Sequence, residues 1–229
     1  MYRRRPMKKI LWYSLEWKNI VMNAAILIGV HLMGVILHEI IMATAGADTT
    51  FPMGTFMSFM AIAFLGLFAN WSDEVLRFNL AISMGETRRR FFLSFMIQYF
   101  VLLLFDWALM YAMARVEIFR LEHMYPNLPV EDFAVGAFHP ISFLLVPLGL
   151  LGLGMLIGGL GLKFGSNSKW FIVVGWVLIC IGMSRIEEGR LLVKFLNLPA
   201  YAYAIIAVAI SIAMIVAAAL MIRRQRVDI

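Results

Sequence analysis

The chain has 229 residues, of which 62% are hydrophobic and 15% charged, with a formal net charge of +6. A soluble domain is ordinarily about 45–50% apolar and about 25% charged, so a soluble chain of this length could not cover so much apolar surface. The composition indicates an integral membrane protein and excludes a dinucleotide-binding, barrel-enzyme or nucleic-acid-binding domain, so no nucleic acid is expected as a partner. The single cysteine, Cys180, allows neither an intrachain disulfide nor a cysteine metal cluster.

The first 19 residues combine basic and aromatic side chains in a pattern typical of an interfacial amphipathic helix. Pro6 suits a first helical position, Lys8 and Glu16 fall on one side of a helical wheel, and Tyr13 and Trp17 fall on another. We expect residues 1–19 to lie on the inner leaflet; a cytoplasmic extension of the first span is the alternative. No small-residue cleavage site follows the basic stretch, so a cleaved signal peptide is not expected.

Six segments are apolar enough to cross the ~30 Å hydrocarbon core, which takes about 20 residues as a helix. They are residues 20–43, 51–71, 91–114, 139–162, 170–183 and 201–222. The fifth segment is short for a full crossing. The sequence therefore predicts an all-α integral membrane protein with six transmembrane helices, in a single transmembrane domain of residues 1–229.

The basic residues fall mainly on alternate connections of this six-span arrangement. Fifteen of the 20 lysines and arginines lie in residues 1–19, in the second-to-third and fourth-to-fifth connections and in the tail, against five in the other connections. Because cytoplasmic loops carry the excess of Lys and Arg, both termini are placed in the cytoplasm. We expect a multi-pass protein of the cell (plasma) membrane.

Four ionisable residues fall at membrane depth, where a charge is costly and marks a candidate functional site. His31 and His38 lie seven residues apart, nearly on one face of the first span, and Glu39 follows near its outer end. The His-Glu-x-x-His pattern of zinc sites is absent, so we favour a bundle-facing or pathway-lining role over metal binding or proton coupling, and predict no metal ligands. Asp106 in the third span is the best candidate for an internal pair or a pathway residue.

The connection of residues 72–90 predicts a short cytoplasmic helix followed by a turn. Ser72 and Asp73 suit the start of a helix, and Gly85 suits the left-handed position that ends one. Thr87 can cap the next helix, whose first turn carries three arginines, at positions 88–90. The short helix is too apolar to stand alone in water, so we expect a protein partner to cover it from the cytoplasm.

Two outer segments and a glycine-rich run complete the pattern. Residues 115–138 form a long, mildly acidic outer connection, which either gates release or caps the bundle, and residues 185–199 mix apolar and charged positions. Glycines of the fourth span are spaced for close helix contact, either as a sliding interface or as ordinary tight packing. These glycines are Gly154, Gly158, Gly161 and Gly165.

The chain contains no nucleotide-binding loop of its own. A P-loop requires Gly-x-x-x-x-Gly-Lys-Ser/Thr, and in the glycine-rich run 149–165 Lys163 is wrongly placed and has no following Ser or Thr. Energy from a nucleotide must therefore enter through a separate subunit, and no cofactor is expected in this chain.

The stretch from Phe78 to Arg88, followed by Phe91 and Phe92, resembles the "small/apolar, Gly, x, Thr-Arg, Phe-Phe" pattern of small bacterial permeases in the type-2 ABC exporter family. With six spans, cytoplasmic termini and an amphipathic start, the resemblance covers essentially the whole chain. It implies that residues 1–19 are a connecting helix, that residues 73–85 are a coupling helix inserted into an ATP-binding subunit, and that residues 185–199 are a re-entrant outer segment.

The same resemblance implies a transport subunit rather than an enzyme, with ATP and Mg bound by two copies of a separate ABC ATP-binding subunit. A second permease chain, identical or different, completes the pathway in the lipid bilayer, and the substrate is an amphipathic peptide, an antibiotic or a lipid-like molecule. The resemblance places these residues at or beside the ATPase-subunit interface: Asp73, Glu74, Arg77, Phe78, Asn79, Ile82, Ser83, Met84, Gly85, Glu86, Arg88, Arg89 and Arg90.

Two other classes are weighed against this one. A secondary carrier driven by protons or ions would use His31, His38, Glu39 or Asp106, although the sequence shows no inverted repeat. An intramembrane protease is suggested by the run 187–190, Glu-Glu-Gly-Arg, but its arginine comes two residues early for the Glu-Glu-x-x-x-Arg signature of prenyl-protein proteases.

Overall fold

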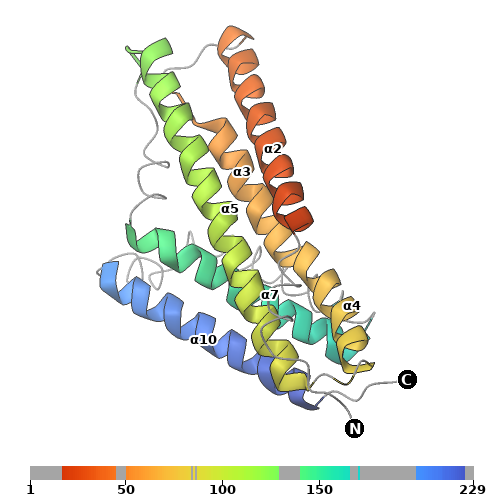
Figure 1. Cartoon of the computed structure of the whole chain (residues 1–229). Helices are drawn as coiled ribbons and strands as arrows, with labels where there is room; N and C mark the ends of the chain where they lie inside the picture. Colours follow the sequence, from red (N-terminus) through yellow and green to blue (C-terminus); the bar gives the residue numbers. More distant parts are fainter. Residues whose placement is uncertain are drawn as a thin grey trace. The chain divides into compact units, whose positions relative to one another are not determined.

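The computed structural model describes residues 17–44, 50–83, 85, 87–128, 140–165, 170 and 200–224. Within these residues the regular structure is helical and no β-strand is formed (Figure 1). The elements are α2 (Trp17–Thr44), α3 (Met53–Phe64), the π-helix η1 (Leu65–Ala69), α4 (Asn70–Ser83), α5 (Arg88–Met124), α7 (Pro140–Phe164) and α10 (Ala200–Arg224). The expected all-α class is confirmed for this part of the chain.

Four of these helices are long and apolar enough to cross a membrane. They are Lys18–Thr44, Arg88–Met124, Leu144–Phe164 and Ala204–Arg223, and they correspond to the first, third, fourth and sixth predicted spans. The apolar helix Met53–Leu67 is shorter and falls within the second. The interfacial helix of residues 1–16, the fifth span beyond residue 170 and the segment 185–199 lie outside the described residues. The helices are compatible with a multi-pass membrane protein.

The surface of α2 illustrates why such a segment forms a membrane helix. No proline interrupts its 28 residues, and the exposed side chains include large apolar ones such as Met22, Leu32 and Ile36. A helix that is apolar around most of its circumference is typical of a membrane span. Its buried polar residues are therefore exceptions that need partners.

The described chain divides into two compact units. The α2–α3–α5 unit contains α2, α3 and α5 from Ser94 onward, and the α7–α10 unit contains α4, the start of α5, α7 from Leu148 and α10. In the first unit α2 and α5 run parallel, with α3 antiparallel beside them (Figure 1). In the second unit α7 and α10 run parallel to each other.

The second apolar segment continues from α3 through η1 directly into α4. The sequence predicted a new helix starting at Ser72, whereas α4 already begins at Asn70, where η1 ends. The predicted start at Ser72 is therefore wrong. The backbone N–H of a residue inside a continuous helix donates to a carbonyl one turn earlier, so no cap is needed there. The hydroxyl of Tyr99 donates a hydrogen bond to the carbonyl of Gly66 inside the π-helix.

The end of α4 depends on a local glycine, whereas the end of α5 depends on tertiary contacts. The expected stop is observed, because α4 ends at Ser83 and Gly85 has a φ of +82°, a conformation that favours glycine. In contrast, α5 runs to Met124, ten residues beyond the expected end of the third span at residue 114. The expected outer connection of residues 115–138 therefore begins as helix, and residues 129–139 lie outside the described part.

Candidate functional site

The buried polar residues of α2 lie on the same stripe as its buried apolar residues. Asn23, Leu27, His31, Gly34 and His38 recur every three or four positions, and all are buried. This spacing places them on one helical face. The face that carries both histidines is therefore the face by which α2 packs inside its unit.

A matching stripe runs along α5 and carries two carboxylates. Its buried members include Asp106, Met110, Ala114, Glu117 and Leu121. Asp106 and Glu117 are eleven residues apart, which is about three turns of helix. The extension of α5 past residue 114 thus brings Glu117 from the expected outer connection into the buried interface.

Glu117 accepts three hydrogen bonds from the first turn of α3. Its Oε1 accepts from the backbone N–H of Gly54 at 2.9 Å, and its Oε2 accepts from the N–H and hydroxyl of Thr55 at 2.7 and 2.6 Å. Pro52 precedes α3 and provides no side-chain cap, so these donors have no partner within their own helix. The carboxylate satisfies them at the positive end of the helix dipole, which stabilises a buried charge.

Two glycines allow the start of α3 to reach both α2 and Glu117. A Cβ atom on Gly34 would lie 2.7 Å from the Cα of Gly54. A Cβ atom on Gly54 would lie 2.9 Å from the carbonyl oxygen of His31 and 3.0 Å from Oε1 of Glu117. Only residues without a Cβ fit this crossing unless the backbones move apart, and such movement would lengthen the bonds to Glu117.

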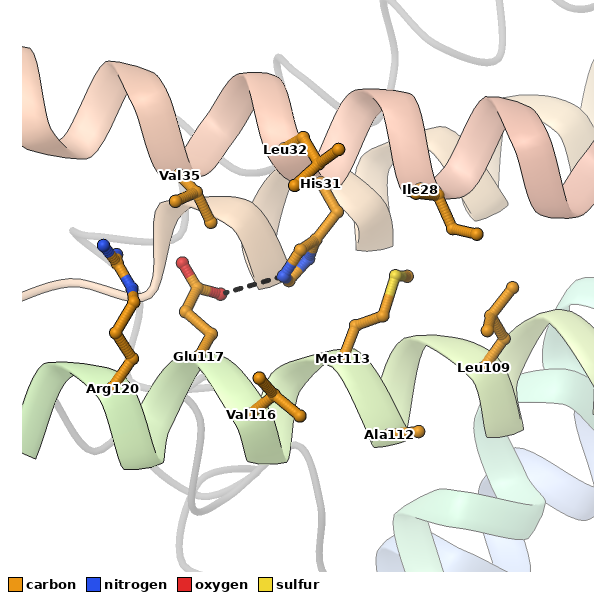
Figure 2. Close-up of a pocket in the computed structure, with 10 residues that line it drawn as sticks. All are labelled: Ile28, His31, Leu32, Val35, Leu109, Ala112, Met113, Val116, Glu117 and Arg120. Atoms are coloured by element: carbon orange, nitrogen blue, oxygen red, sulfur yellow. Dashed lines mark ion pairs between the residues drawn. The ribbon is translucent and has the colours of Figure 1, made fainter.

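His31 links Glu117 to the second turn of α3. Its Nδ1 lies 3.1 Å from the Ser58 hydroxyl, and its Nε2 lies 3.9 Å from Oε2 of Glu117 (Figure 2). The Ser58 hydroxyl donates to the carbonyl of Gly54 at 2.9 Å, so its oxygen accepts the Nδ1 proton of His31. A neutral His31 therefore presents an unprotonated Nε2 toward Glu117.

Asp106 pairs with Asn23 elsewhere along the same interface. The Nδ2 of Asn23 donates to Oδ2 of Asp106 at 3.0 Å, and both side chains are buried. The other carboxylate oxygen, Oδ1, and the indole Nε1 of Trp107 have no hydrogen-bond partner in the described part of the chain. Asp106 is thus paired internally through one oxygen and retains capacity for another donor.

Glu39, Arg120 and Tyr125 form an ionic cluster at the end of the interface where α2 and α5 terminate. Arg120 Nη1 donates to Oε1 of Glu39 at 2.5 Å, and the Tyr125 hydroxyl donates to Oε2 at 2.9 Å. This hydrogen bond to a carboxylate raises the pKa of the Tyr125 phenol above its ordinary value. His38 packs edge-on against Tyr125, with its Nδ1 3.6 Å from Glu39 Oε1, too far for a hydrogen bond.

A groove of about 420 Å³ lies between α2 and α5 beside this interface (Figure 2). Its polar lining residues are His31, Glu117 and Arg120; the apolar ones are Ile28, Leu32, Val35, Leu109, Ala112, Met113 and Val116. Among the described residues no group of three or more His, Cys, Asp or Glu is placed to hold a metal ion. The groove therefore offers an apolar wall with a few polar groups rather than a metal centre.

The turn between α4 and α5 gathers part of the expected ATPase-subunit interface. Phe78 is fully buried, and its ring meets that of Phe91 edge-on with centroids 5.4 Å apart. Phe78 therefore fastens α4 to α5 from inside and offers no surface of its own. The exposed residues of the turn are Asn79, Leu80, Ser83, Gly85, Thr87 and Arg89.

Arg88 connects the same turn to α10. Its Nη1 donates to the backbone carbonyl oxygen of Arg223 at 3.0 Å, in the last turn of α10, where carbonyls lack partners within the helix. Arg77, Ile82 and Arg90 are half-buried, and both arginines make contacts of their own. The side chains of Asp73 and Glu74, and residues Met84 and Glu86, lie outside what the structure describes.

Close packing of α7 on α10 involves glycines that the sequence analysis did not single out. A Cβ atom on Gly152 would lie 3.0 Å from the carbonyl oxygen of Ser211, and one on Gly159 would lie 3.2 Å from the Cα of Ala218. The two glycines are seven residues apart, so both face α10. Of the predicted set, Gly154, Gly158 and Gly161 are buried, and Gly165 is exposed at the end of α7 with a φ of +56°.

Sequence reasoning missed the residues that pair with the predicted ones. These are Asn23, Thr55, Ser58, Glu117, Arg120 and Tyr125. The signal for Glu117 was present, because it continues the three- and four-residue spacing of Asp106, Met110 and Ala114. The charges at positions 115, 117 and 120 ended the span by hydropathy instead. Asn23 and Ser58 carry no charge, and such residues are ordinary within membrane helices.

Comparison with known proteins identifies no relative of this chain. No protein-family model matches the chain, and neither a curated protein nor a solved structure is found to match it. The Glu-Glu-Gly-Arg run at 187–190 lies outside the described residues.

Proposed function

We propose that this chain is the membrane-spanning permease subunit of an ATP-driven type-2 ABC exporter. Its α4–α5 turn docks on a cytoplasmic ATP-binding subunit, and two permease chains with two such subunits form the working assembly. ATP and Mg are bound by the partner, so the permease carries out no chemistry. The observation that carries the proposal is the exposed α4–α5 turn, which is fastened from behind to α5 and to α10.

The exposed face of the turn suits a protein partner. Leu80 is 60% exposed, and Asn79, Ser83 and Arg89 are exposed around it. The arginines at 88–90 favour the cytoplasmic side of the membrane, where Leu80 would otherwise face water. An apolar residue surrounded by polar ones, with arginine beside it, is typical of a protein contact.

The contacts that join the α4–α5 turn to other helices support a role in transmitting movement from a partner. The Phe78–Phe91 contact joins it to the start of α5, and the hydrogen bond of Arg88 joins it to the end of α10. A displacement imposed on the turn by closure of an ATP-binding subunit would therefore act on both helices. α10 would pass it to α7, because Gly152 leaves little space against Ser211.

Helix directions within each unit also support the six-span arrangement. α2 and α5 run parallel, as a first and a third span must, and α3 runs against them. α7 and α10 run parallel, as a fourth and a sixth span must. Together with the excess of basic residues on one set of connections, these directions support the proposal that both termini are cytoplasmic.

The test measures Mg-dependent ATP hydrolysis that copurifies with the full chain, extracted from its native membrane in mild detergent. Arg89→Glu and Leu80→Asp are each expected to lower the bound ATPase activity at least tenfold. The matched controls are Arg115→Glu and Met124→Asp, which change exposed residues of α5 outside the turn. ATPase activity that is absent from the wild type, or equal in turn variants and controls, would refute the proposal.

A proton- or ion-coupled secondary carrier is the alternative, and the buried pairs at Asp106 and His31 favour it. Ionisable residues inside a bilayer often mark ion pathways, and Asp106 and His31 both have polar partners within the interface. In proteoliposomes without an ATPase, a carrier would move protons down an imposed gradient, and Asp106→Asn would abolish that flux. The permease proposal expects no such flux from the wild type.

A further inference from the structure

The chain passes between its two compact units inside helices rather than in loops. The crossings are Gly66–Leu67, Leu93–Ser94 and Pro147–Leu148. The first is in the π-helix η1, the second is in α5 and the third is in α7. Any movement of one unit against the other must therefore bend a helix at these points.

The first crossing falls within the five residues of η1. A π-helical turn is rare, and its change from i+4 to i+5 spacing interrupts the hydrogen-bond ladder, so sharp kinks are found at such turns. The buried Tyr99 donates its hydroxyl proton to the carbonyl of Gly66 in this turn. A Cβ atom on residue 66 would lie 3.3 Å from that hydroxyl, so glycine leaves room for the contact. Tyr99 thus holds the last residue of the α2–α3–α5 unit before the chain leaves it.

The third crossing comes directly after a proline inside α7. Pro147 has no N–H, so the carbonyl four residues earlier loses its helical donor, and the proline ring crowds that carbonyl. Membrane helices tolerate proline, and sharp kinks occur there. Two of the three crossings therefore coincide with an interruption of the helical ladder, and the two interruptions have unrelated chemical causes.

The second crossing has no such interruption. α5 contains neither proline nor glycine. Before the crossing the ring of Phe91 contacts that of Phe78, and after it the ring of Phe95 contacts that of Tyr99. Each of these contacts lies within one unit, so a movement of the units leaves both in place. An uninterrupted helix keeps its direction better than an interrupted one, which suits α5 as a pivot.

We propose that the three crossings form a hinge, at which the α7–α10 unit moves against the α2–α3–α5 unit by bending at η1 and at Pro147 with α5 as the pivot. Hinges typically lie at a few positions that absorb the change in backbone angles. The hydrogen bond from Tyr99 restrains the bend at η1. The hinge does not depend on an ATP-binding partner, so its absence would leave the proposed function untouched.

The test measures distances between pairs of spin labels by double electron–electron resonance, on the full chain in lipid nanodiscs. Cys180→Ala ensures that labels attach only to introduced cysteines. Labels at Ile36 and Ile212 report between the units, and labels at Ile36 and Phe105 report within the α2–α3–α5 unit; all three positions are exposed. A hinge predicts a between-unit distance distribution at least about twice as wide as the within-unit one.

Pro147→Ala tests the bend in α7. Alanine restores the missing N–H, so the between-unit distribution should become narrower by at least about 1.5-fold. Pro140→Ala is the matched control, because it changes the first residue of the same helix. An N–H at that position has no acceptor within the helix, so the substitution should leave the distribution as it is in the parent protein.

Tyr99→Phe tests the restraint at η1. The loss of the hydroxyl should widen the between-unit distribution by at least about 1.5-fold and leave the within-unit distribution unchanged. The control Tyr201→Phe removes the hydroxyl of an exposed tyrosine on α10 and should change neither. Equal widths for the two label pairs in the parent protein, or a match between either variant and its control, would overturn the proposal. A Tyr99→Phe protein in which both distributions widen would show general loosening and would also overturn it.

Discussion

The helices within the α2–α3–α5 unit and the helices within the α7–α10 unit are held together by different kinds of contact. In the first, charged and polar side chains cross between helices, with Glu117 on α3, Asp106 on Asn23 and Arg120 on Glu39. In the second, the described contacts between α7 and α10 are close approaches at small residues. Both kinds of contact suit a membrane protein, in which the burial of apolar side chains contributes little to the association of helices.

The difference teaches which unit can respond to its surroundings. A polar contact changes with a proton, a bound ion or a donor from a ligand, so the first unit contains groups that a small event can alter. A close contact at glycine depends only on how well the surfaces of the two helices fit together. The first unit therefore contains the buried groups that a proton, an ion or a ligand can alter, whereas the contact between α7 and α10 in the second unit can only transmit a displacement.

The largest expected effect breaks the polar unit at Glu117. Glu117→Gln replaces an acceptor with an amide nitrogen facing the N–H donors of α3, and we expect the free energy of unfolding to fall by about 3 kcal/mol. Unfolding in mixed detergent, followed by circular dichroism, measures this. The control Glu122→Gln changes an exposed carboxylate on the same helix and should cost less than about 0.5 kcal/mol. Similar losses in both variants would mean that the α3 contact contributes nothing.

The next effect separates α2 from α3 by shape. Gly34→Ala places a Cβ 2.7 Å from backbone atoms of Gly54 and Met53, and we expect a loss of about 2 kcal/mol in the free energy of unfolding. Gly29→Ala is the control, because nothing lies within 4 Å of a Cβ there. A Gly34→Ala protein as stable as the control would show that the helices part without cost.

A smaller effect is expected at the α7–α10 contact. Gly152→Ala places a Cβ 3.0 Å from the carbonyl oxygen of Ser211, and a small backbone shift should limit the loss to about 1 kcal/mol. Gly149→Ala, with no neighbour within 4 Å, should be neutral in the same unfolding assay. If Gly152→Ala also leaves stability unchanged, close packing is not what holds α7 on α10.

The smallest effect concerns Asn23 and Asp106. A double-mutant cycle with Asn23→Ala and Asp106→Ala should give a coupling free energy of about 0.6 kcal/mol, the average for hydrogen bonds inside membrane proteins. The four unfolding free energies of the cycle measure it. A coupling near zero would place the two side chains apart, whereas one above about 2 kcal/mol would point to a charge that the pair alone holds in the membrane.

Hydropathy was sufficient to locate α2, α7 and α10. The predicted spans 20–43, 139–162 and 201–222 agree with these helices to within three residues at each end. Their boundaries depend on local composition, because the apolar run itself determines where a membrane helix can lie. The stop at Gly85 was predictable for a similar reason, since a positive φ is a property of one residue.

Tertiary contacts determined what the sequence analysis could not reach. Glu117 and Arg120 looked like the start of an outer connection, and they remain helical because α3 and Glu39 provide partners that lie 62 and 81 residues away in sequence. Ser72 is a residue type that suits the start of a helix, but no helix starts there because α4 already includes it. His31, His38, Glu39 and Asp106 were thus identified from the sequence, whereas the residues that they contact, Glu117 and Arg120 among them, were not.

The bond between Glu117 and the start of α3 also has a consequence for how the protein is made. The donors of Thr55 enter the membrane 62 residues ahead of their acceptor, which at about 5–20 residues per second of translation is a delay of roughly 3–12 seconds. During that time the ribosome-bound hairpin of α2 and α3 has no anion for its exposed amides. Until α5 arrives, the amides of Gly54 and Thr55 lack the carboxylate to which they donate in the folded chain.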